Sequence, residues 1–404
     1  MVSQFVNKTI GALTPGISAV GDKCCGCWAC VAICPVKCLS MKGDRAGFEY
    51  PTYDSGCIGC GKCEKACPVM SPQPPDGTVG VAWAKAKDDG LRERSSSGGV
   101  FGLLAEKTLG LGGVVYGAAF GEGCRTVEHV RVVRMDQLDG VMRSKYTQSM
   151  MGVGTYKDVS DDLKYGKQVL FSGVGCQCAG LRNYLNEKHV PTDNLFVVEI
   201  LCHGVPSPGL WSKWIDYKKA AVGMGLAEIN EVNFRSKSSG WTTYSVAYHV
   251  ATEKVESTRF GNDWYMKAFL SNASLRESCL HCPVKRCSGS DIEIGDYWGV
   301  YNVHPDIADE LGVSAVICNT VKGEAAIGAL GDVLSLGPTT FQDIANGNPA
   351  LTKSVRPYAK RTEFLDDVAA STPIEKLVLK WTFAPSLAQR VRGKLGRVKR
   401  KLIG

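Results

Sequence analysis

The sequence predicts an α+β protein in which a small cysteine-rich module precedes a larger body of mixed strands and helices. Ten of the 18 cysteines fall between Cys24 and Cys67. After a stretch rich in Pro and Gly, SPQPPDG, strand patterns alternate with helical patterns, as in domains whose helices pack on a sheet. The 404 residues leave room for about two or three domains.

Changes in composition along the chain suggest where these domains begin and end. The stretch after the cysteine-rich module reads as a linker because Pro and Gly interrupt regular structure. We expect a loosely ordered N-terminus over residues 1–20, the cysteine-rich module over 21–70, the linker over 71–78, an N-terminal α/β domain over 79–160, a C-terminal domain over 161–370 and a basic tail over 371–404.

Within the body, strands are predicted where apolar residues alternate or run continuously, and helices where they recur every three or four residues. A run of serines is expected to cap the first of these helices. The expected helices cover residues 95–109, 178–187 and 206–220, and the expected strands cover 78–86, 112–120, 127–134, 167–173, 195–204, 229–236, 242–250, 290–299 and 313–321.

Two cysteine runs share the spacing Cys-x2-Cys-x2-Cys-x3-Cys-Pro. Three cysteines spaced in this way wrap one [4Fe–4S] cubane, and in two-cluster ferredoxins the fourth cysteine binds the neighbouring cluster. We therefore predict a bacterial-type ferredoxin module with interleaved ligands. The predicted sets are Cys24, Cys27, Cys30 and Cys67 for the first cluster, and Cys57, Cys60, Cys63 and Cys34 for the second.

The main alternative for these cysteines is a pair of zinc sites. Zinc sites usually show two separated cysteine pairs rather than four cysteines ending in Cys-Pro, so the pattern favours clusters. Gly26, Gly59 and Gly61 would let backbone amides approach the sulfurs. Cys25 and Cys38 lie off the pattern, and we expect both to be free buried thiols.

Further cysteines in the body leave a third metal site open on pattern alone. Cys279 and Cys282 form a Cys-x2-Cys pair without a matching pair elsewhere, and Cys287 follows five residues later. Cys176 and Cys202 stand near the ends of predicted strands.

Six segments of the body then carry a resemblance to a known family. They are SSSGGVFGLL (95–104), SKYTQS (144–149), GVGCQCAGLRNYL (173–185), ILCHGVPSP (200–208), CLHCPVKRCSGSDIEIGDYWG (279–299) and NPALTKSVRPYAKR (348–361). In these motifs and their order the chain, from Cys24 to about residue 368, resembles the coenzyme F-420 hydrogenase/dehydrogenase beta-subunit family with a fused N-terminal ferredoxin.

The resemblance implies a third [4Fe–4S] cluster in the body. Its implied ligands are Cys176, Cys202, Cys279 and Cys282, with Cys287 as an alternative. The family usually has Gly-Thr-Pro-Cys where this chain has Gly-Val-Gly-Cys before and at residue 176. This departure changes the expected turn and leaves the thiolate in place.

The resemblance also implies that the mixed α/β body binds FAD. Serine hydroxyls and free backbone N–H groups at a helix start can hold a phosphate or a flavin carbonyl, and a nearby lysine would add positive charge. An ordinary helix cap and a solvated lysine are the alternatives. A nicotinamide site is not expected, because the glycine spacing at 173–180 does not fit G-x-G-x-x-G. The predicted cofactor-binding residues are Ser95, Ser96, Ser97, Gly98, Gly99, Lys145, Gln148 and Ser149.

Together these features predict an iron–sulfur flavoprotein oxidoreductase. Flavin exchanges two electrons with a substrate and single electrons with clusters, so it would link the ferredoxin clusters to a two-electron substrate. His203 is the candidate for proton transfer because its ordinary pKa is near neutral, although a structural role is the alternative. Asp296 could shape the site or form a turn. Neither the substrate nor the use of a deazaflavin follows from the motifs. A non-enzymatic electron carrier that docks redox partners and a zinc-binding interaction protein are the competing functions.

The C-terminal end suggests one further contact. Residues 380–404 contain eight Lys or Arg and no acid, whereas the whole chain has a net charge of +7. Apolar residues recur at helical spacing in this tail, which suits contact with an anionic membrane surface or an acidic redox partner. Nucleic acid is not expected, since aromatic residues are not interleaved. With no apparent signal peptide or membrane-spanning run, we expect a cytoplasmic protein, with peripheral attachment at the inner face of the membrane as a variant of that location.

Overall fold

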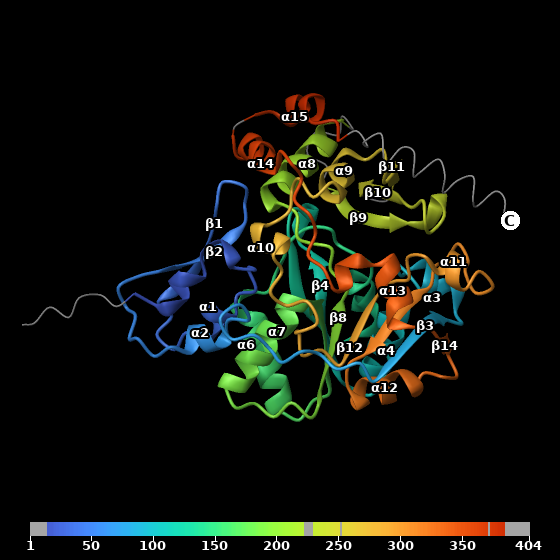
Figure 1. The fold of residues 1–404 in the computed structure, drawn as a ribbon, viewed down its shortest axis with the longest axis horizontal. Helices are drawn as coiled ribbons and strands as arrows, with labels where there is room; N and C mark the ends of the chain where they lie inside the picture. Colours follow the sequence, from blue (N-terminus) through green and yellow to red (C-terminus); the bar gives the residue numbers. More distant parts are fainter. Residues whose placement is uncertain (1–13, 222–228, 251–252, 371, 384–404) are drawn as a thin grey trace, which may run out of the picture.

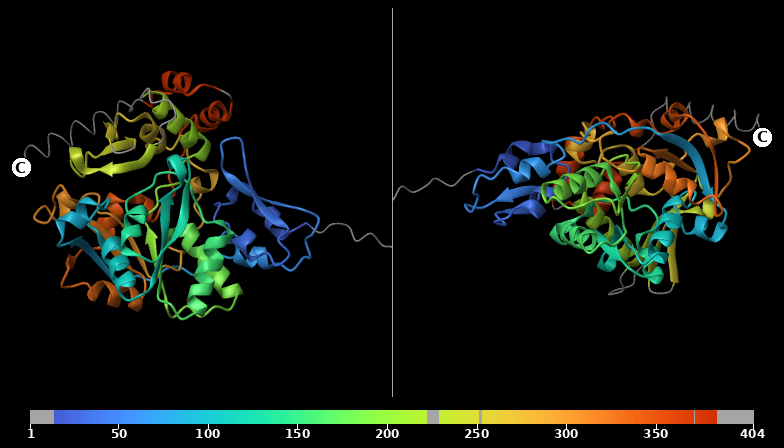
Figure 2. Two further views of the ribbon diagram at one scale, coloured as in Figure 1. Left: turned by 180° about the vertical axis from the view of Figure 1, so that it is seen from behind. Right: turned by 90° about the horizontal axis from the view of Figure 1, so that it is seen from below.

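The computed structural model describes residues 14–221, 229–250, 253–370 and 372–383. The ferredoxin module, residues 16–70, lies at one end of a larger body in every view (Figures 1 and 2). Each of its two short α-helices follows a residue in the left-handed conformation, Trp28 or Gly61, with φ of 71° and 70°. Its elements are η1 (Gly16–Lys23), α1 (Ala29–Ile33), β1 (Leu39–Gly43), β2 (Glu49–Tyr53) and α2 (Lys62–Ala66).

The body is built on a nine-stranded mixed sheet in the order β14-β3-β13-β12-β8-β7-β4-β5-β6. The four neighbouring strands β12, β8, β7 and β4 run parallel, and β13, β3 and β14 continue the sheet antiparallel on one side. The strands are β3 (Gly80–Ala86), β4 (Val114–Phe120), β5 (Val127–Val132), β6 (Ser149–Met150), β7 (Val169–Val174), β8 (Leu195–Ile200), β12 (Ile292–Asp296), β13 (Ser314–Cys318) and β14 (Leu334–Pro338).

Helices cover both faces of this sheet. On one face, residues of α4 and α12 share an apolar core with alternate residues of the central strands, such as Val115 and Val316. On the other face, α6 and α7 pack over β7 and β8, and α1 of the ferredoxin module joins the same core. The bounds are α3 (Asp89–Glu93), α4 (Val100–Gly110), α5 (Leu138–Val141), α6 (Gly152–Lys164), α7 (Gly175–Glu187) and α12 (Val321–Gly328).

A second, three-stranded antiparallel sheet lies above the first in Figure 1 and packs with four helices around an aromatic core. Trp211, Phe234 and Tyr265 are fully buried at its centre. The bounds are β9 (Ile229–Ser236), β10 (Ser245–Val250), β11 (Glu253–Arg259), α8 (Pro208–Ala221), α9 (Trp264–Leu270), α14 (Arg361–Ala369) and α15 (Ile374–Lys380); the short helices α10 (Glu277–Leu280), α11 (Val300–Val303) and α13 (Phe341–Gly347) lie between the sheets or beside the first.

The α+β class is confirmed, and every predicted strand overlaps one in the structure. The serine cap is wrong. Helix α4 begins after Gly99, whose φ of 87° only glycine adopts without strain, and no side chain caps it. The predicted linker is tied to the body, because Asp76 accepts hydrogen bonds from Ser288 and from the backbone of Gly289. None of the described helices has the length and apolar character that crossing a membrane requires.

Candidate metal and cofactor site

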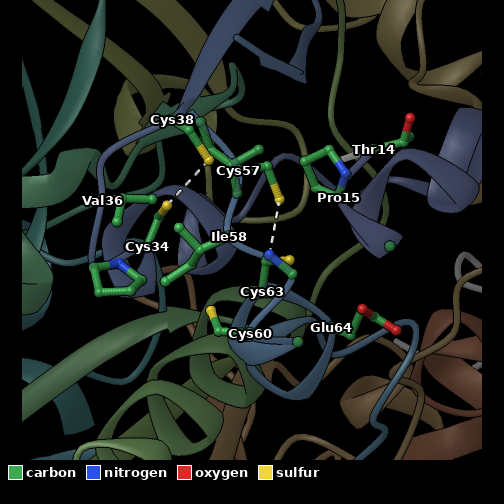
Figure 3. Close-up of a pocket in the computed structure, with 15 residues that line it drawn as sticks. Thr14, Pro15, Cys34, Val36, Cys38, Cys57, Ile58, Cys60, Cys63 and Glu64 are labelled. Atoms are coloured by element: carbon green, nitrogen blue, oxygen red, sulfur yellow. Dashed lines mark hydrogen bonds between the residues drawn. The ribbon is translucent and has the colours of Figure 1, made fainter. Parts of the chain in front are cut away.

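The second predicted ligand set surrounds a cavity in the ferredoxin module. Cys34, Cys57, Cys60 and Cys63 all line this cavity, whose volume is about 240 Å³ (Figure 3). Cys34 comes from the first cysteine run and the other three from the second, so the chain brings together the interleaved set. The backbone N–H of Gly59 points to the Cys57 sulfur at 3.5 Å, as expected for a thiolate that backbone amides stabilise.

The first predicted set is gathered on the side of the module that faces the body. Cys27, Cys30 and Cys67 are buried, with 6–7% of their surface exposed. Burial and the neighbouring Cys24, Cys67 and Cys63 raise the pKa of the Cys30 thiol well above its ordinary value. Burial also raises the pKa of Cys67 to about 12. Packed thiols of this kind become thiolates at neutral pH only when a metal group replaces their protons.

Among the residues that the structure describes, no three His, Cys, Asp or Glu side chains converge closely enough to hold a single ion. In a cubane each thiolate binds a different iron, so its ligands stand around a larger group. The cavity between Cys34, Cys57, Cys60 and Cys63 has the room that such a group needs.

The third predicted set meets in the body, where three parts of the chain approach one another. Cys176 lies in the first turn of α7, Cys202 follows β8, Cys279 is in α10 and Cys282 comes just after it. Burial raises the pKa of Cys202 to about 11 and of Cys279 to about 12, and the neighbouring cysteines of the set add to both shifts. Cys287 stays the alternative ligand. Burial raises the pKa of its thiol, and the described charges that act on it are Asp76, Arg286 and Glu199.

The sequence did not predict the position of Cys25. Its thiol lies between Cys176 of the body and Cys27 of the ferredoxin module, and hydrogen bonds from these two thiols lower its pKa well below the ordinary value. Cys25 therefore joins the first ligand set to the third. Cys38, the other cysteine off the pattern, is buried in the module, and its sulfur lies 3.5 Å from that of Cys34.

One large cavity of about 710 Å³ lies at the carboxyl ends of the parallel strands β7 and β8. Its wall includes seven of the eight predicted cofactor-binding residues together with cysteines of the third set. The predicted residues in its wall are Ser95, Ser96, Ser97, Gly99, Lys145, Gln148 and Ser149, and the same wall contains Cys25, Cys176, Cys202 and His203. Gly98 is not in the wall; a Cβ there would lie 2.3 Å from the carbonyl of Ala84, so glycine is required by the strand packed against it.

The serines of the cavity wall hold its loops in place. Ser97 donates to the carbonyl of Val313 at 2.7 Å, and Ser95 donates to that of Leu91 at 2.8 Å. The Ser96 oxygen accepts from the backbone N–H of Ser144 at 2.8 Å, which ties the start of α4 to the 144–149 segment.

Lys145 reaches the cavity wall with its ammonium group turned towards the backbone. It donates to the carbonyls of Gly140 and Met142 at 2.9 and 2.5 Å. Burial, with the charge of Arg143, lowers the pKa of Lys145 to about 7. Its predicted role as a free positive charge therefore requires the side chain to leave these carbonyls.

His129 is part of the wall and was missed in the sequence. Its Nδ1 lies 2.7 Å from the Ser149 hydroxyl and its Nε2 lies 3.0 Å from the carbonyl of Ser172. Burial lowers its pKa to about 4, so the ring is neutral at physiological pH. An isolated histidine within a strand pattern gave no signal of this position.

Arg235 is a second wall residue that the sequence did not single out. Its guanidinium pairs with Asp296 at 3.0 Å and stacks on the rings of Tyr244 and Trp298, 4.0 and 4.9 Å from their centres. Asp296, which sequence analysis left between shaping the site and forming a turn, thus holds a cavity cation. The Arg235 Nε is buried without a hydrogen-bond partner among the described residues.

His203, the predicted proton-transfer residue, also lies in the wall. Its Nε2 is 2.7 Å from the side-chain oxygen of Asn272, and burial lowers its pKa below the ordinary value. The imidazole is therefore held neutral and oriented. A neutral ring with one nitrogen engaged can still exchange a proton through the other.

Comparison with known proteins agrees with the two parts of this site. Residues 23–71 match the 4Fe-4S dicluster domain, and residues 166–336 match the family model for the C terminus of the beta subunit of coenzyme F420 hydrogenase/dehydrogenase. The chain joins a dicluster ferredoxin domain to a domain of this hydrogenase/dehydrogenase family. These domains support iron–sulfur electron transfer of the oxidoreductase type as its general function.

The matched stretch 166–336 contains Cys176, Cys202, Cys279 and Cys282. A chain in the xenon-derivatised F420-reducing [NiFe] hydrogenase complex from Methanosarcina barkeri is similar over 76% of this chain and 93% of that chain, with 15% identity and a TM-score of 0.47. Comparison with curated proteins finds no match.

Proposed function

We propose that the protein is an iron–sulfur flavoprotein oxidoreductase that passes electrons between the ferredoxin clusters and a two-electron substrate through a third [4Fe–4S] cluster and FAD. One observation carries this proposal. A single large cavity has the predicted flavin-binding segments in one part of its wall and cysteines of the third set in another. Electrons move rapidly only over short distances, so cofactors that exchange them must lie close together.

The cavity fits an organic cofactor in size and in chemistry. Its volume of about 710 Å³ lies within the range of sites for cofactors and small ligands. Arg235 presents a buried N–H group, its Nε, without a described partner. Buried donors are rarely left unpaired in folded proteins, which favours a polar group of a ligand at this place.

The residues of the wall have separable roles in this proposal. Ser96 and Ser97 fix the loop before α4, where free backbone N–H groups would face a phosphate or a flavin carbonyl. The Arg235 guanidinium would hold a ring or an anionic group, and His203 would exchange a proton with the substrate. Bound FAD would supply the exchange between two-electron and one-electron chemistry.

Anaerobic purification with iron and flavin assays tests the proposal directly. We expect about twelve irons and about one flavin per chain. Replacing both Cys279 and Cys282 with Ser should remove about four irons, whereas Cys287→Ser, the matched control, should retain all of them. Full iron retention in the double variant would reject the third cluster, and the absence of flavin after reconstitution would reject the flavoprotein.

The second candidate function is a non-enzymatic electron carrier that docks a redox partner. The exposed edge of the second cluster site offers a place for such docking, because Cys60 is exposed and Ile58 beside it has 58% of its surface exposed. A partner protein could exchange electrons there in either function. Clusters without flavin would favour the carrier, and zinc without iron would remove both functions.

Of the predicted basic tail over 371–404, the part over 384–404 lies outside the described residues, and the part over 372–383 contains α15, which packs into the aromatic core. The tail's contact with an anionic membrane, at the inner face of a cytoplasmic membrane, remains part of the proposal and rests on sequence alone. Deleting residues 384–404 should weaken binding to vesicles that contain anionic lipid. Equal binding by the full and the shortened chain would reject this contact.

A further inference from the structure

A fully buried arginine stands where the ferredoxin module meets the body. Arg276, just before α10, has 0% of its surface exposed. Its guanidinium donates to the backbone carbonyls of Cys24 and Glu49, both at 2.7 Å, and to the side-chain oxygen of Gln148 at 3.3 Å. It also stacks on Tyr50, with its central carbon 4.4 Å from the centre of the ring. The Arg276 side chain, which belongs to the body, therefore binds two separate segments of the module.

No described carboxylate forms an ion pair with this cation. The charge of Arg276 does act on the Glu49 carboxyl, lowering a pKa that burial raises, but this carboxylate accepts its hydrogen bond from the indole of Trp28 at 3.0 Å, and only the backbone carbonyl of Glu49 binds Arg276. Other buried arginines of the protein are paired: Arg92 with Asp309, Arg235 with Asp296. A buried charge without a counter-charge is strongly unfavourable, so the site calls for a negative group.

Arg276 contacts residues of two ligand sets. Its guanidinium donates to the carbonyl of Cys24 of the first set at 2.7 Å, and its own backbone carbonyl accepts the N–H of Cys279 of the third set at 3.1 Å. Between these two sets lies Cys25, beside Cys27 of the first and Cys176 of the third. A [4Fe–4S] group with four thiolates is negatively charged, and reduction adds one more negative charge.

Gln148 adds an unpaired donor at the same place. With 7% of its surface exposed, it accepts from Arg276 through Oε1, while its Nε2 has no described partner. That Nε2 lies 2.6 Å from where a Cβ on Gly26 would be, so it is aimed at the loop between two ligands of the first set. Gly26 leaves the space open and has a φ of +70°.

We propose that Arg276, supported by Gln148, is the counter-charge shared by the first ferredoxin cluster and the third cluster, and that it raises the reduction potentials of both. A cation favours the more negative, reduced state of a nearby cluster. Arg276 is thus a positioning residue that acts through charge and also holds the module on the body. For the third cluster the proposal rests on the proposed function; for the first it rests on the dicluster domain alone.

Redox titration monitored by electron paramagnetic resonance tests this inference on the purified full chain. Arg276→Gln should shift the potential of the first cluster to more negative values, with that of the second, more distant cluster unchanged. Arg276→Lys keeps the charge and should retain most of the wild-type potential. Arg92→Gln is the matched control: it removes a buried guanidinium paired with Asp309, and should move no potential.

A second variant keeps the test informative if Arg276→Gln loses its clusters. Gln148→Glu places a carboxylate within reach of the guanidinium and neutralises it without removing the anchor. It should retain the iron content and shift the first potential in the negative direction. Unchanged potentials in either iron-replete variant would overturn the inference. An iron count of about eight in the wild type would remove the third cluster, while the potential of the first would still decide the role of Arg276.

Discussion

Replacing Gly180 with Ala tests how closely the ferredoxin module approaches the body. A Cβ at Gly180, inside α7, would lie 3.0 Å from the hydroxyl of Tyr156, 3.2 Å from the sulfur of Cys27 and 3.4 Å from the Cβ of Ala29. None of these atoms is the free end of a mobile chain. Tyr156 is fully buried and donates to the carbonyl of Cys27 at 2.5 Å, and Cys27 is a predicted cluster ligand.

Two opposing effects decide whether this substitution raises or lowers the free energy of unfolding. Alanine is favoured over glycine inside a helix by about 0.5–1 kcal/mol. Overpacking a well-packed contact costs about 1–3 kcal/mol. Because the contacted atoms are fixed by their own packing, we expect the overpacking cost to exceed the gain in helix propensity. Gly180→Ala should therefore lower the free energy of unfolding by about 1 kcal/mol.

Thermal unfolding under anaerobic conditions, followed by circular dichroism, measures this difference. A change of 1 kcal/mol shifts Tm by about 2–4 °C in domains of 150–250 residues. Gly154→Ala in α6 is the matched control, since a Cβ there meets no atom within 4 Å, and it should leave Tm unchanged or raise it. If Gly180→Ala unfolds at or above the wild-type temperature with full iron content, the close approach of module and body is wrong.

Three further predictions concern the rest of the structure. Burial, then the charge of Glu293, raises the pKa of Glu199 to about 8, so the folded protein keeps a proton that the unfolded chain releases near its ordinary pKa of 4.5. The free energy of unfolding should therefore fall as the pH rises towards 8, by at most about 1.4 kcal/mol per pH unit, and Tm should fall with it. Glu199→Gln should make Tm depend less on pH over this range. Ser96→Ala removes the acceptor of the Ser144 N–H and should lower the flavin content per chain, while an unchanged content would separate this loop from cofactor binding. Gly47→Ala puts a Cβ 2.6 Å from a backbone nitrogen at the start of α8, at a φ of +84°, and should make the β1–β2 hairpin more sensitive to limited proteolysis.

The grouping of the module's cysteines could be predicted because their geometry is local. Cysteines spaced by two residues follow one tight loop, and Cys34 and Cys67 each end a short helix that carries them to the other set. The strands were predictable for a similar reason, because the apolar residues that become buried alternate or run continuously within each segment. Their order in the sheet was not, because pairing between β12 and β8 joins residues that lie far apart in the chain, such as Ile292 and Val198.

Helix α6 has a helical apolar pattern in its sequence, but two glycines in its first turn argue against a helix. Tyr156, Val159 and Leu163 recur at helical spacing and are all buried. Gly152 and Gly154 in its first turn are poor helix formers and hid this pattern. Packing of the buried face against the sheet and the module supplies what the local propensity lacks, which is the usual way in which tertiary contacts override it.

The junction between module and body shows what no local pattern could supply. Cys25, Gln148 and Arg276 are more than 100 residues apart from one another in the chain, so no spacing rule relates them. Cys25 was expected to be an inert thiol and Gln148 a flavin contact; the structure brings both to the guanidinium or to the thiols beside it. The polar side chains here are buried. Among the described residues, the Arg276 guanidinium has no ion-pair partner and the Gln148 Nε2 has no hydrogen-bond partner. An interface that served only to hold two domains together would be more stable with apolar residues. A buried positive charge between two sets of thiols is explained if the interface holds negatively charged groups. The reduction potentials of the Arg276 and Gln148 variants measure how strongly those groups depend on this charge.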